Sequence, residues 1–181
     1  MEWLLILVAV LAVALYVWHC VDVFLSSRPG RVLYVSSSVG QVAPVLDDII
    51  ARYIPKTEKV LFIEPGAGIG NVARLMARRY RWKEVQAIDI SVLLCFWAKA
   101  YALAFRSPLK VFRGNIFNQN YPKGSLVYCY LTSPILERLH KEKKLEGTLV
   151  VTLTFAIPGV QATEECSLTN WQGQVYVYDF R

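Results

Sequence analysis

The chain of 181 residues is poor in the side chains that zinc sites and hydrolase triads need. It has only two histidines, His19 in an apolar run and His140 in a charged helix end, and neither is placed to act as a catalytic base. No cysteine belongs to a C-x-x-C motif or to a Cys/His pair at ligand spacing: Cys20, Cys95, Cys129 and Cys166. The sequence therefore predicts no metal site and no Ser-His-acid hydrolase, and we expect reduced, structural thiols.

Full charge is absent from Trp3 to Val21, the stretch WLLILVAVLAVALYVWHCV. As a helix it would span about 28 Å, close to the hydrocarbon thickness of a bilayer. A buried core helix normally has a polar face, which this stretch lacks. A secretory signal peptide has a basic start, whereas this N-terminus carries Glu2 and no Lys or Arg. We therefore expect residues 1–27 to form a transmembrane anchor.

Basic residues are missing before the anchor, while Arg28 and Arg31 follow it. The positive-inside rule then predicts a single-pass membrane protein whose larger domain is cytoplasmic. Because the N-terminus lacks an Arg-rich amphipathic transit pattern, a prokaryotic inner membrane is favoured over a mitochondrial one. The net charge of +6 lies almost wholly after the anchor and suits anionic headgroups. No dense run of Lys and Arg favours nucleic acid as the partner.

Apolar runs and helical patterns alternate after a connector and pre-motif segment at residues 28–43. The expected strands and helices between residues 59 and 156 have the spacing of parallel crossover units. The pattern predicts an α/β, doubly wound, mostly parallel and Rossmann-like domain over residues 44–181. Its expected strands are 59–63, 85–90, 109–117, 125–131, 147–157 and 174–180, and its expected helices are 43–54, 71–80, 92–105 and 133–145, with Ser91 and Ser133 as N-caps.

Three glycines, Gly66, Gly68 and Gly70, separate the first expected strand from the helix that follows. Glycine lets backbone N–H groups approach a ligand, and ligands of such sheets bind at the carboxyl ends of the strands. Asp89 ends the second expected strand, 19 residues after Gly70, where a carboxylate can accept hydrogen bonds from ribose hydroxyls. The turn is therefore a candidate cofactor site.

Three cofactor classes compete for this turn. A P-loop would need Lys and Ser/Thr at positions where GAGIGNVA has neither. The dinucleotide pattern G-x-G-x-x-G is weakened by Asn71, which stands where its third glycine belongs. The S-adenosylmethionine motif, an acidic residue followed by x-G-x-G-x-G, fits EPGAGIG at every position. A tight turn without ligand is the remaining alternative. We predict S-adenosyl-L-methionine, bound by Glu64, Gly66, Ala67, Gly68, Gly70, Asp89 and Ile90.

The third expected strand runs into RGNIF. In class I methyltransferases an acid or amide at this place often contacts the adenine. Asn115 is the residue at that place, with Ile116 as an apolar wall, and both are predicted to bind the cofactor. The alternative for Asn115 is a capping role at a strand end.

The segment YCYLTSP follows the fourth expected strand and lacks the [DN]-P-P-[YF] motif of methyltransferases that act on base amino groups or glutamine amides. Methyl transfer to an amine depends on positioning, and a lysine must lose its proton to attack. A partly apolar aromatic pocket favours the neutral amine. Tyr130, Thr132 and Ser133 are the predicted catalytic pocket. Alternation puts Tyr128 and Tyr130 on one face, so packing is the competing role of both.

The order of SSSVGQVAPVLDDII, EPGAGIGN, AIDIS, GNIF, VYCYLTSPILERL and GTLVVTLTFAIPG resembles a family of membrane-anchored protein lysine methyltransferases. Its mitochondrial members modify the adenine nucleotide translocase and the ATP synthase c subunit, and it has prokaryotic relatives. The resemblance implies a membrane-protein substrate and a role for Ser36 to Gln41, with Pro44, in the active site. Its more specific points are Tyr130, Leu131, Pro134, Phe155, Ile157, Pro158 and Gly159.

Several positions depart from that family. Glu64 replaces the usual aspartate, Ile69 and Asn71 stand where an acid and an arginine are common, Asp89 replaces a frequent Glu and Asn115 a frequent Asp. The substrate therefore stays open between a protein lysine and a lipid-soluble small molecule. A non-catalytic membrane scaffold is the third hypothesis.

The C-terminal region is short, with 25 residues after Ala156. A full seven-stranded sheet needs two strands there. Residues 174–180 supply one, and the segment near Cys166 to Trp171 is the candidate for the other. No helix is expected before them, which would leave one face of the sheet open. The domain would then be trimmed, or a partner or the membrane surface would cover that face.

Overall fold

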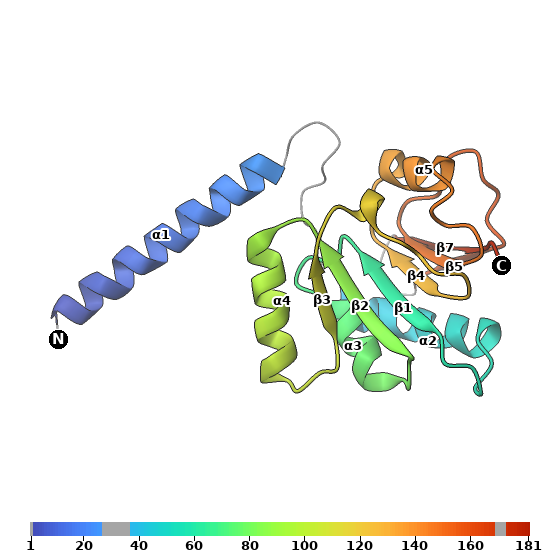
Figure 1. Ribbon diagram of the computed structural model, residues 1–181, viewed down its shortest axis with the longest axis horizontal. Coiled ribbons are helices and arrows are strands. Elements are labelled where there is room, and N and C mark those ends of the chain that lie inside the picture. The colour runs from blue at the N-terminus through green and yellow to red at the C-terminus, as the bar shows by residue number, and fades with distance from the viewer. Residues whose placement is uncertain (1, 27–36, 169–172) are drawn as a thin grey trace.

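The computed structural model describes residues 2–26, 37–168 and 173–181 (Figure 1). Its elements alternate in the order expected of a doubly wound domain, after an N-terminal helix that stands apart. In chain order they are α1 Glu2–Ser26, α2 Val39–Tyr53, β1 Leu61–Pro65, α3 Asn71–Arg79, β2 Glu84–Asp89, α4 Val92–Ala104, β3 Lys110–Arg113, the 3₁₀ helix η1 Ile116–Asn118, β4 Leu126–Cys129, α5 Ser133–Lys141, β5 Leu149–Leu153, β6 Glu164–Ser167 and β7 Gln174–Asp179.

The strands form one seven-stranded sheet in the order β3-β2-β1-β4-β5-β7-β6. All pairs from β3 to β5 are parallel, and β7 is antiparallel to both of its neighbours. The chain winds outward in one direction through β1, β2 and β3 and in the other through β4 and β5. The strand order therefore reverses between β1 and β4, where a ligand is expected at the carboxyl ends.

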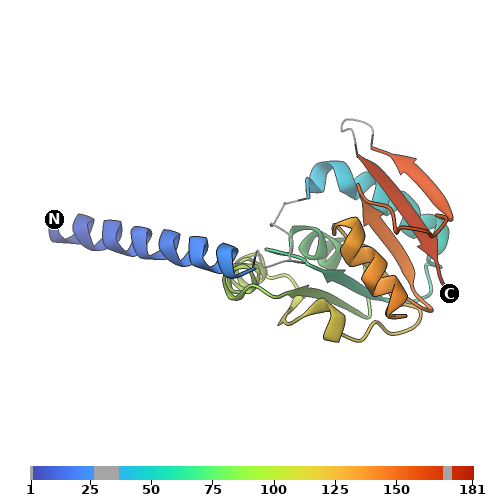
Figure 2. The same cartoon turned by 90° about the horizontal axis from the view of Figure 1, so that it is seen from above.

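Helices cover both faces of the sheet (Figures 1 and 2). Successive strand residues point to opposite sides, so Phe62 packs on one face and Ile63 on the other. The first face carries α2, α3 and α4, and the second carries α5. The central strands β4 and β5 are buried along their whole length, as expected of parallel strands covered on both sides.

The C-terminal part of the sheet is complete, so the expectation of a trimmed sheet is wrong. The partner strand anticipated near Cys166 is β6, which pairs with β7 from Glu164 to Ser167. The expectation of an open face is also wrong beside β5 and β7. There the connection after β5 folds back onto the sheet: Ile157 is buried, and its backbone N–H donates to the hydroxyl of buried Tyr178 at 2.9 Å. A loop therefore covers this face of the sheet, in place of the helix that was expected to be necessary.

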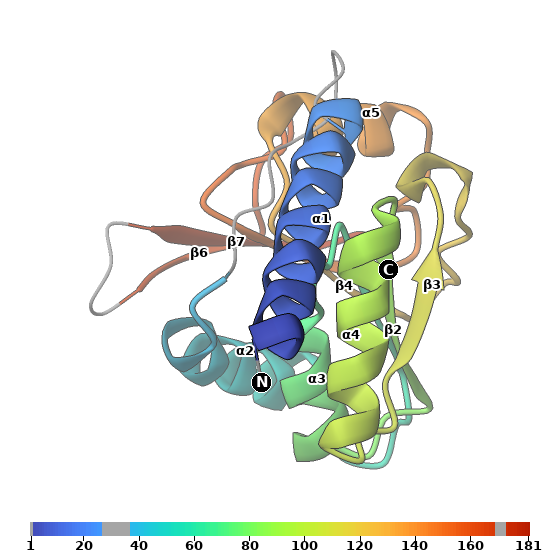
Figure 3. The ribbon, with the colours of Figure 1, turned by 90° about the vertical axis from the view of Figure 1, so that its left-hand side faces the viewer.

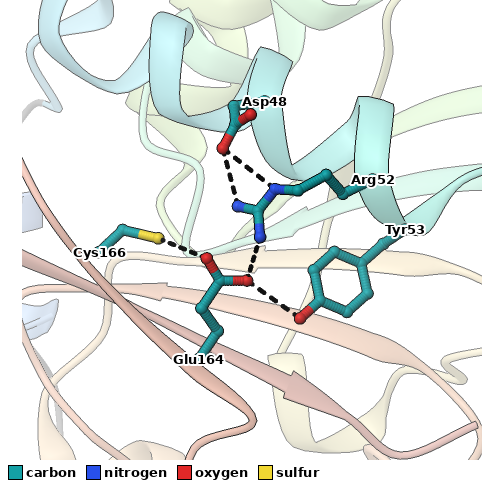
Figure 4. Close-up of polar contacts among 5 residues, drawn as sticks. All are labelled: Asp48, Arg52, Tyr53, Glu164 and Cys166. Carbon is teal, nitrogen blue, oxygen red and sulfur yellow. Dashed lines mark hydrogen bonds and ion pairs between the residues drawn. The ribbon is translucent and has the colours of Figure 1, made fainter.

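The edge strand β6 is tied to α2 by a polar cluster (Figure 4). Arg52 forms ion pairs with Asp48, one turn earlier, and with Glu164 of β6. The Tyr53 hydroxyl donates to the Glu164 carboxylate at 3.1 Å. The hydrogen bond from Arg52 holds the pKa of Glu164 below its usual value. The cluster thus fastens the edge strand of the sheet to the first helix of the domain.

The helix α1 extends away from the α/β domain, and its nearest neighbour is α4 (Figures 1 and 3). Its large apolar side chains are exposed on all sides, among them Trp3, Leu7, Leu11 and Leu15. Within the residues that were described in full, no helix is both long and apolar enough to cross a membrane. The expected connector lies mostly outside the described residues, and α2 begins at Val39, inside the segment assigned to it.

Breaking the pair of Arg52 and Glu164 is expected to cost stability. A double-mutant cycle with Arg52→Ala and Glu164→Ala should give a coupling free energy of about 0.5 kcal/mol at neutral pH, because both side chains are partly exposed. Since the folded-state pKa of Glu164 is lowered, the coupling is present above the ordinary Glu pKa and is lost as the pH falls through the lowered one. Urea unfolding measures it.

The matched control is the exposed pair of Lys143 and Glu146, whose charged atoms are 3.7 Å apart. Its cycle should give a coupling near zero. Equal couplings for the two pairs, or a coupling of Arg52 and Glu164 that survives at acid pH, would contradict this account.

Candidate active site

The turn between β1 and α3 has a backbone that favours glycine. Gly66, Gly68 and Gly70 have φ values of +70°, +57° and +69°, in the left-handed region. A Cβ on Gly66 would also lie 2.6 Å from Cδ2 of Leu131, which follows β4. The turn is thus pressed against the end of β4, at the point where the strand order reverses.

The carboxylate of Asp89 holds this turn to the end of β2. One oxygen accepts from the backbone N–H of Gly68 at 2.8 Å, and the other from that of Ser91 at 2.9 Å. The Ala67 N–H donates to the Ile88 carbonyl at 3.0 Å. Ser91 then caps α4 by accepting from the Leu94 N–H, which confirms the predicted N-cap. Asp89 therefore joins the glycine turn to the start of α4.

Glu64 lies beneath the turn, with 6% of its surface exposed. Its Oε2 accepts from the backbone N–H of Ala73 at 2.7 Å, in the first turn of α3. Burial raises the pKa of this carboxyl to about 8, and the nearby charge of Asp89 acts in the same direction. Glu64 thus holds a proton near neutral pH and positions α3. Whether it also touches a cofactor remains a prediction.

The predicted adenine residues lie beside the end of β2. The backbone N–H of Gly114, at the end of β3, donates to the Asp89 carbonyl at 2.9 Å. The side chain of Asn115 accepts from the Phe117 N–H at 3.0 Å and caps η1, so the alternative capping role is confirmed. Ile116 and Ile90 are half-buried. Glycine turn, Asp89 and Asn115 thus share one edge of the sheet, although their contact with a cofactor stays a prediction.

The two tyrosines of the fourth strand have different environments. Tyr128 is fully buried in the core, which confirms the packing role for this residue. Tyr130 follows the end of β4 and is only half-buried, packed against the same core. Only Tyr130 is placed where a substrate could reach it.

The N-cap of α5 lies one residue earlier than expected. Thr132, not Ser133, is its N-cap, because the Thr132 carbonyl accepts from the N–H groups of Ile135 and Leu136 while Ser133 is already helical. Both side chains are half-buried. The three predicted catalytic residues therefore flank Leu131 in the chain, and Leu131 lies against the glycine turn.

Sequence reasoning missed one contact at this edge. The hydroxyl of Ser37, just before α2, lies 3.2 Å from the hydroxyl of buried Tyr128. It brings the start of α2 to the end of β4. The resemblance implied a role for Ser36 to Gln41 in the active site, but no residue type indicated that Ser37 would meet Tyr128, which was considered only for packing.

Replacement of Gly66 tests how tightly the turn is built. Gly66→Ala should destabilise by more than about 2 kcal/mol, since it combines a left-handed backbone with a clash against Leu131. Gly124→Ala is the matched control, because φ there is +78° and nothing lies within 4 Å. It should cost only about 1 kcal/mol. In a Leu131→Ala background the two costs should become equal, as measured by urea unfolding; a Gly66→Ala cost that stays the same would contradict the contact.

Substitution of Glu64 tests its protonation. Between about pH 4.5 and 8 the folded state keeps a proton that the unfolded chain releases, so stability falls as the pH rises. Glu64→Gln keeps an acceptor for the Ala73 N–H but does not titrate. Above pH 8 it should exceed the wild type by more than about 1 kcal/mol, and at pH 4.5 it should match it. Exposed Glu165→Gln is the control, and urea unfolding that gives both variants the same pH profile would contradict the raised pKa.

No protein-family model matches the sequence, and the comparison with curated proteins gives no match. Solved structures share the fold. An RNA methyltransferase from Salinibacter ruber, solved in complex with S-adenosyl-L-homocysteine, aligns with a TM-score of 0.65 and 18% identity over 80% of this chain and 92% of its own. A ribosomal protein L11 methylase from Lactobacillus delbrueckii subsp. bulgaricus gives 0.60 and 15%, over 78% and 80%. The METTL16 MTase domain gives 0.61 and 14%, over 81% and 70%. The chain therefore has the Rossmann-like fold of S-adenosylmethionine-dependent methyltransferases.

Proposed function

We propose that the protein is an S-adenosylmethionine-dependent methyltransferase. One observation carries the proposal: the Asp89 carboxylate, at the carboxyl end of β2, also holds the glycine turn at the point of strand reversal. The neighbour from Salinibacter ruber, with the same fold, was solved with S-adenosyl-L-homocysteine. By analogy, the turn from Gly66 to Gly70 lies along the methionine part of the cofactor, Asp89 takes the ribose, and Asn115 with Ile116 and Ile90 takes the adenine.

The cofactor supplies a methyl group on a sulfonium, which is already a good leaving group. The protein then has to place the nucleophile in line, keep it unprotonated and exclude water. Tyr130 offers a half-buried aromatic surface for this, and Thr132 and Ser133 offer hydroxyls beside it. Such surroundings disfavour the charged form of an amine and so lower its pKa. The side chains thus suit an amine acceptor better than an acceptor that needs a strong base.

The substrate we propose is a lysine in a membrane protein. The absence of [DN]-P-P-[YF] after β4, the segment Tyr130, Leu131 and Pro134, and the resemblance to membrane-anchored lysine methyltransferases support it. The solved neighbours named as acting on RNA or on a ribosomal protein share only the fold, so they do not choose among substrates. A lipid-soluble small molecule is the alternative acceptor, and a non-catalytic scaffold is the alternative to an enzyme.

We also propose that α1 holds the protein at a membrane, with the α/β domain on the cytoplasmic side. The support is the run without full charge from Trp3 to Val21, the exposure of its large apolar side chains and the basic residues that follow it. A prokaryotic inner membrane is the proposed location. This arrangement keeps the domain beside membrane proteins, which shortens the search for such a substrate.

Asp89 gives the sharpest test. Asp89→Asn should weaken binding of S-adenosyl-L-homocysteine to the detergent-solubilised full chain at least about tenfold, because a charged acceptor for the ribose is lost. Glu165→Gln, an exposed acid-to-amide change on β6, should bind like the wild type. Isothermal titration calorimetry measures both. In parallel, labelled S-adenosylmethionine and host membranes should give methyl-lysine in a protein band with the wild type and the control only.

Other outcomes discriminate among the alternatives. Label in the lipid extract would replace the lysine substrate with a lipid-soluble one. A wild-type chain that is folded but binds no S-adenosyl-L-homocysteine would leave the scaffold. Equal binding by Asp89→Asn and wild type would contradict the ribose contact.

A further inference from the structure

The helix α4 is apolar around its whole circumference. In the sequence VLLCFWAKAYALA, Lys99 is the only charged residue. A surface helix normally has a polar outer stripe, and a helix that is apolar on every side is normally buried. Yet α4 covers the end of the sheet formed by β2 and β3, with its outer side away from the core (Figures 1 and 3).

The bulky residues of α4 are on its outside. The stripe facing the sheet consists of small buried residues, Cys95, Ala98 and Ala102. The outer side carries large side chains that are exposed by between 37% and 82%, and we call them the α4 apolar surface: Val92, Phe96, Trp97, Tyr101, Leu103 and Phe105. Burying small residues while exposing large ones is the reverse of what hydrophobic burial favours in water. The outer face of α4 is therefore built for contact.

This exposure is concentrated rather than scattered. Among the described residues outside α1, only Phe112 and Phe155 join the α4 apolar surface as exposed large hydrophobics. Single exposed apolar residues are normal on proteins, whereas contiguous ones mark an interaction site. The exposed apolar side chains of α4 thus form one contiguous patch, which marks one interaction site.

Aromatic and basic groups border the patch. The rings of Trp97 and Tyr101 are 6.1 Å apart, and those of Tyr101 and Phe105 are 6.4 Å apart. The guanidinium of Arg74 lies over the last two rings, at 5.2 and 5.4 Å. Tyr, Trp and Arg are side chains that combine an apolar body with a polar end, as the boundary between lipid and water requires.

The chain next to α4 carries basic residues and no acidic ones. Residues 90–113 contain no Asp or Glu and four basic residues: Lys99, Arg106, Lys110 and Arg113. Of these, Lys110 pairs with Glu84, whereas Lys99 lies within α4 itself and Arg106 directly follows its end. A helix with exposed apolar residues flanked by Lys and Arg complements anionic lipid headgroups.

We propose that the α4 apolar surface rests on the anionic surface of the membrane that holds α1, as a second contact of the domain with lipid. The inference rests on the membrane association proposed above. Two observations support this occupant: the charge complementarity, and the position of α1, an exposed apolar helix that approaches α4 (Figure 3). A nucleic-acid strand would use the aromatic rings and the basic groups, but it gives no reason for Leu103, at 82% the most exposed member of the patch.

This contact sets the orientation of the active site. Since α4 begins three residues after Asp89, the first turn of the helix adjoins the edge where the cofactor residues gather. A contact of α1 alone would fix the domain to the bilayer at one place only. With α4 also on the lipid, the carboxyl edge of the sheet stays at one height above the bilayer, within reach of a membrane-protein loop.

Trp97 is a built-in reporter for this contact. The full chain is reconstituted into phosphatidylcholine vesicles with and without phosphatidylglycerol, carrying brominated phosphatidylcholine as quencher, and flotation shows how much protein is bound. The contribution of Trp97 is the difference between the chain and its Trp97→Phe variant, in a background where Trp3→Phe and Trp18→Phe silence α1. Quenching of Trp97 is expected, and it should be stronger with phosphatidylglycerol.

Phe96 and Leu103 lie on one side of α4, seven residues apart, so Phe96→Glu with Leu103→Glu should abolish the quenching of Trp97 while α1 keeps the chain on the vesicles. Phe155→Glu, a single change of the same type outside the patch, should leave the quenching of Trp97 unchanged. Circular dichroism checks that each variant is folded.

Four outcomes would overturn the inference. A bound chain whose Trp97 is not quenched by bromolipid refutes the α4 contact but leaves the anchoring role of α1. A chain that does not float with vesicles refutes both, while cofactor binding still decides the enzyme class. If neither bromolipid nor aqueous iodide quenches Trp97, the patch is covered by α1 or by a second copy of the chain. Binding of single-stranded RNA that the double Glu variant loses would assign it to nucleic acid.

Discussion

The site depends on the two hydrogen bonds that the carboxylate of Asp89 accepts. Its two oxygens accept from Gly68 and Ser91, so one side chain joins the end of β2 to the glycine turn after β1 and to the start of α4. Three glycines in the left-handed region would otherwise leave a turn with several accessible conformations. With Asp89 in place, the backbone around β1 and the helix beside β2 are held as one unit.

The fold could be predicted from the sequence because its signals are local. Buried parallel strands are short apolar runs, and the helices between them carry caps and the 3.6-residue period, so β1 to β5 were found. What the sequence left open or missed depends on distant partners. The strand β6 was only a candidate near Cys166, because its pairing with β7 and the ion pair of Glu164 with Arg52 join residues far apart in the chain. The closed face beside β5 depends on Ile157 reaching the hydroxyl of Tyr178, which no local pattern encodes.

For the candidate site, too, the sequence predicted the position but not the details. The spacing of the glycines and the acid at the end of β2 predicted which edge of the sheet carries the candidate site, because the motif determines the conformation of the turn and its position in the sheet. The environment of each side chain was not predictable. Tyr128 and Tyr130 share a face, yet one is enclosed by the core and the other is half-buried at the edge. Glu64 is predicted as a ligand of the cofactor, and that role stays a prediction; its burial, its raised pKa and its bond to the start of α3 could not be read from the motif.

The polar cluster of α2 and β6 has a consequence for the order of synthesis. Arg52 emerges from the ribosome more than a hundred residues before Glu164, and until then α2 lacks the strand that fastens its outer end. The α/β domain therefore closes late, after β1 to β5 have been made. A domain whose contacts join its two ends in this way completes its folding only when the chain of its last strands is available, and until then its apolar faces stay open to wrong contacts.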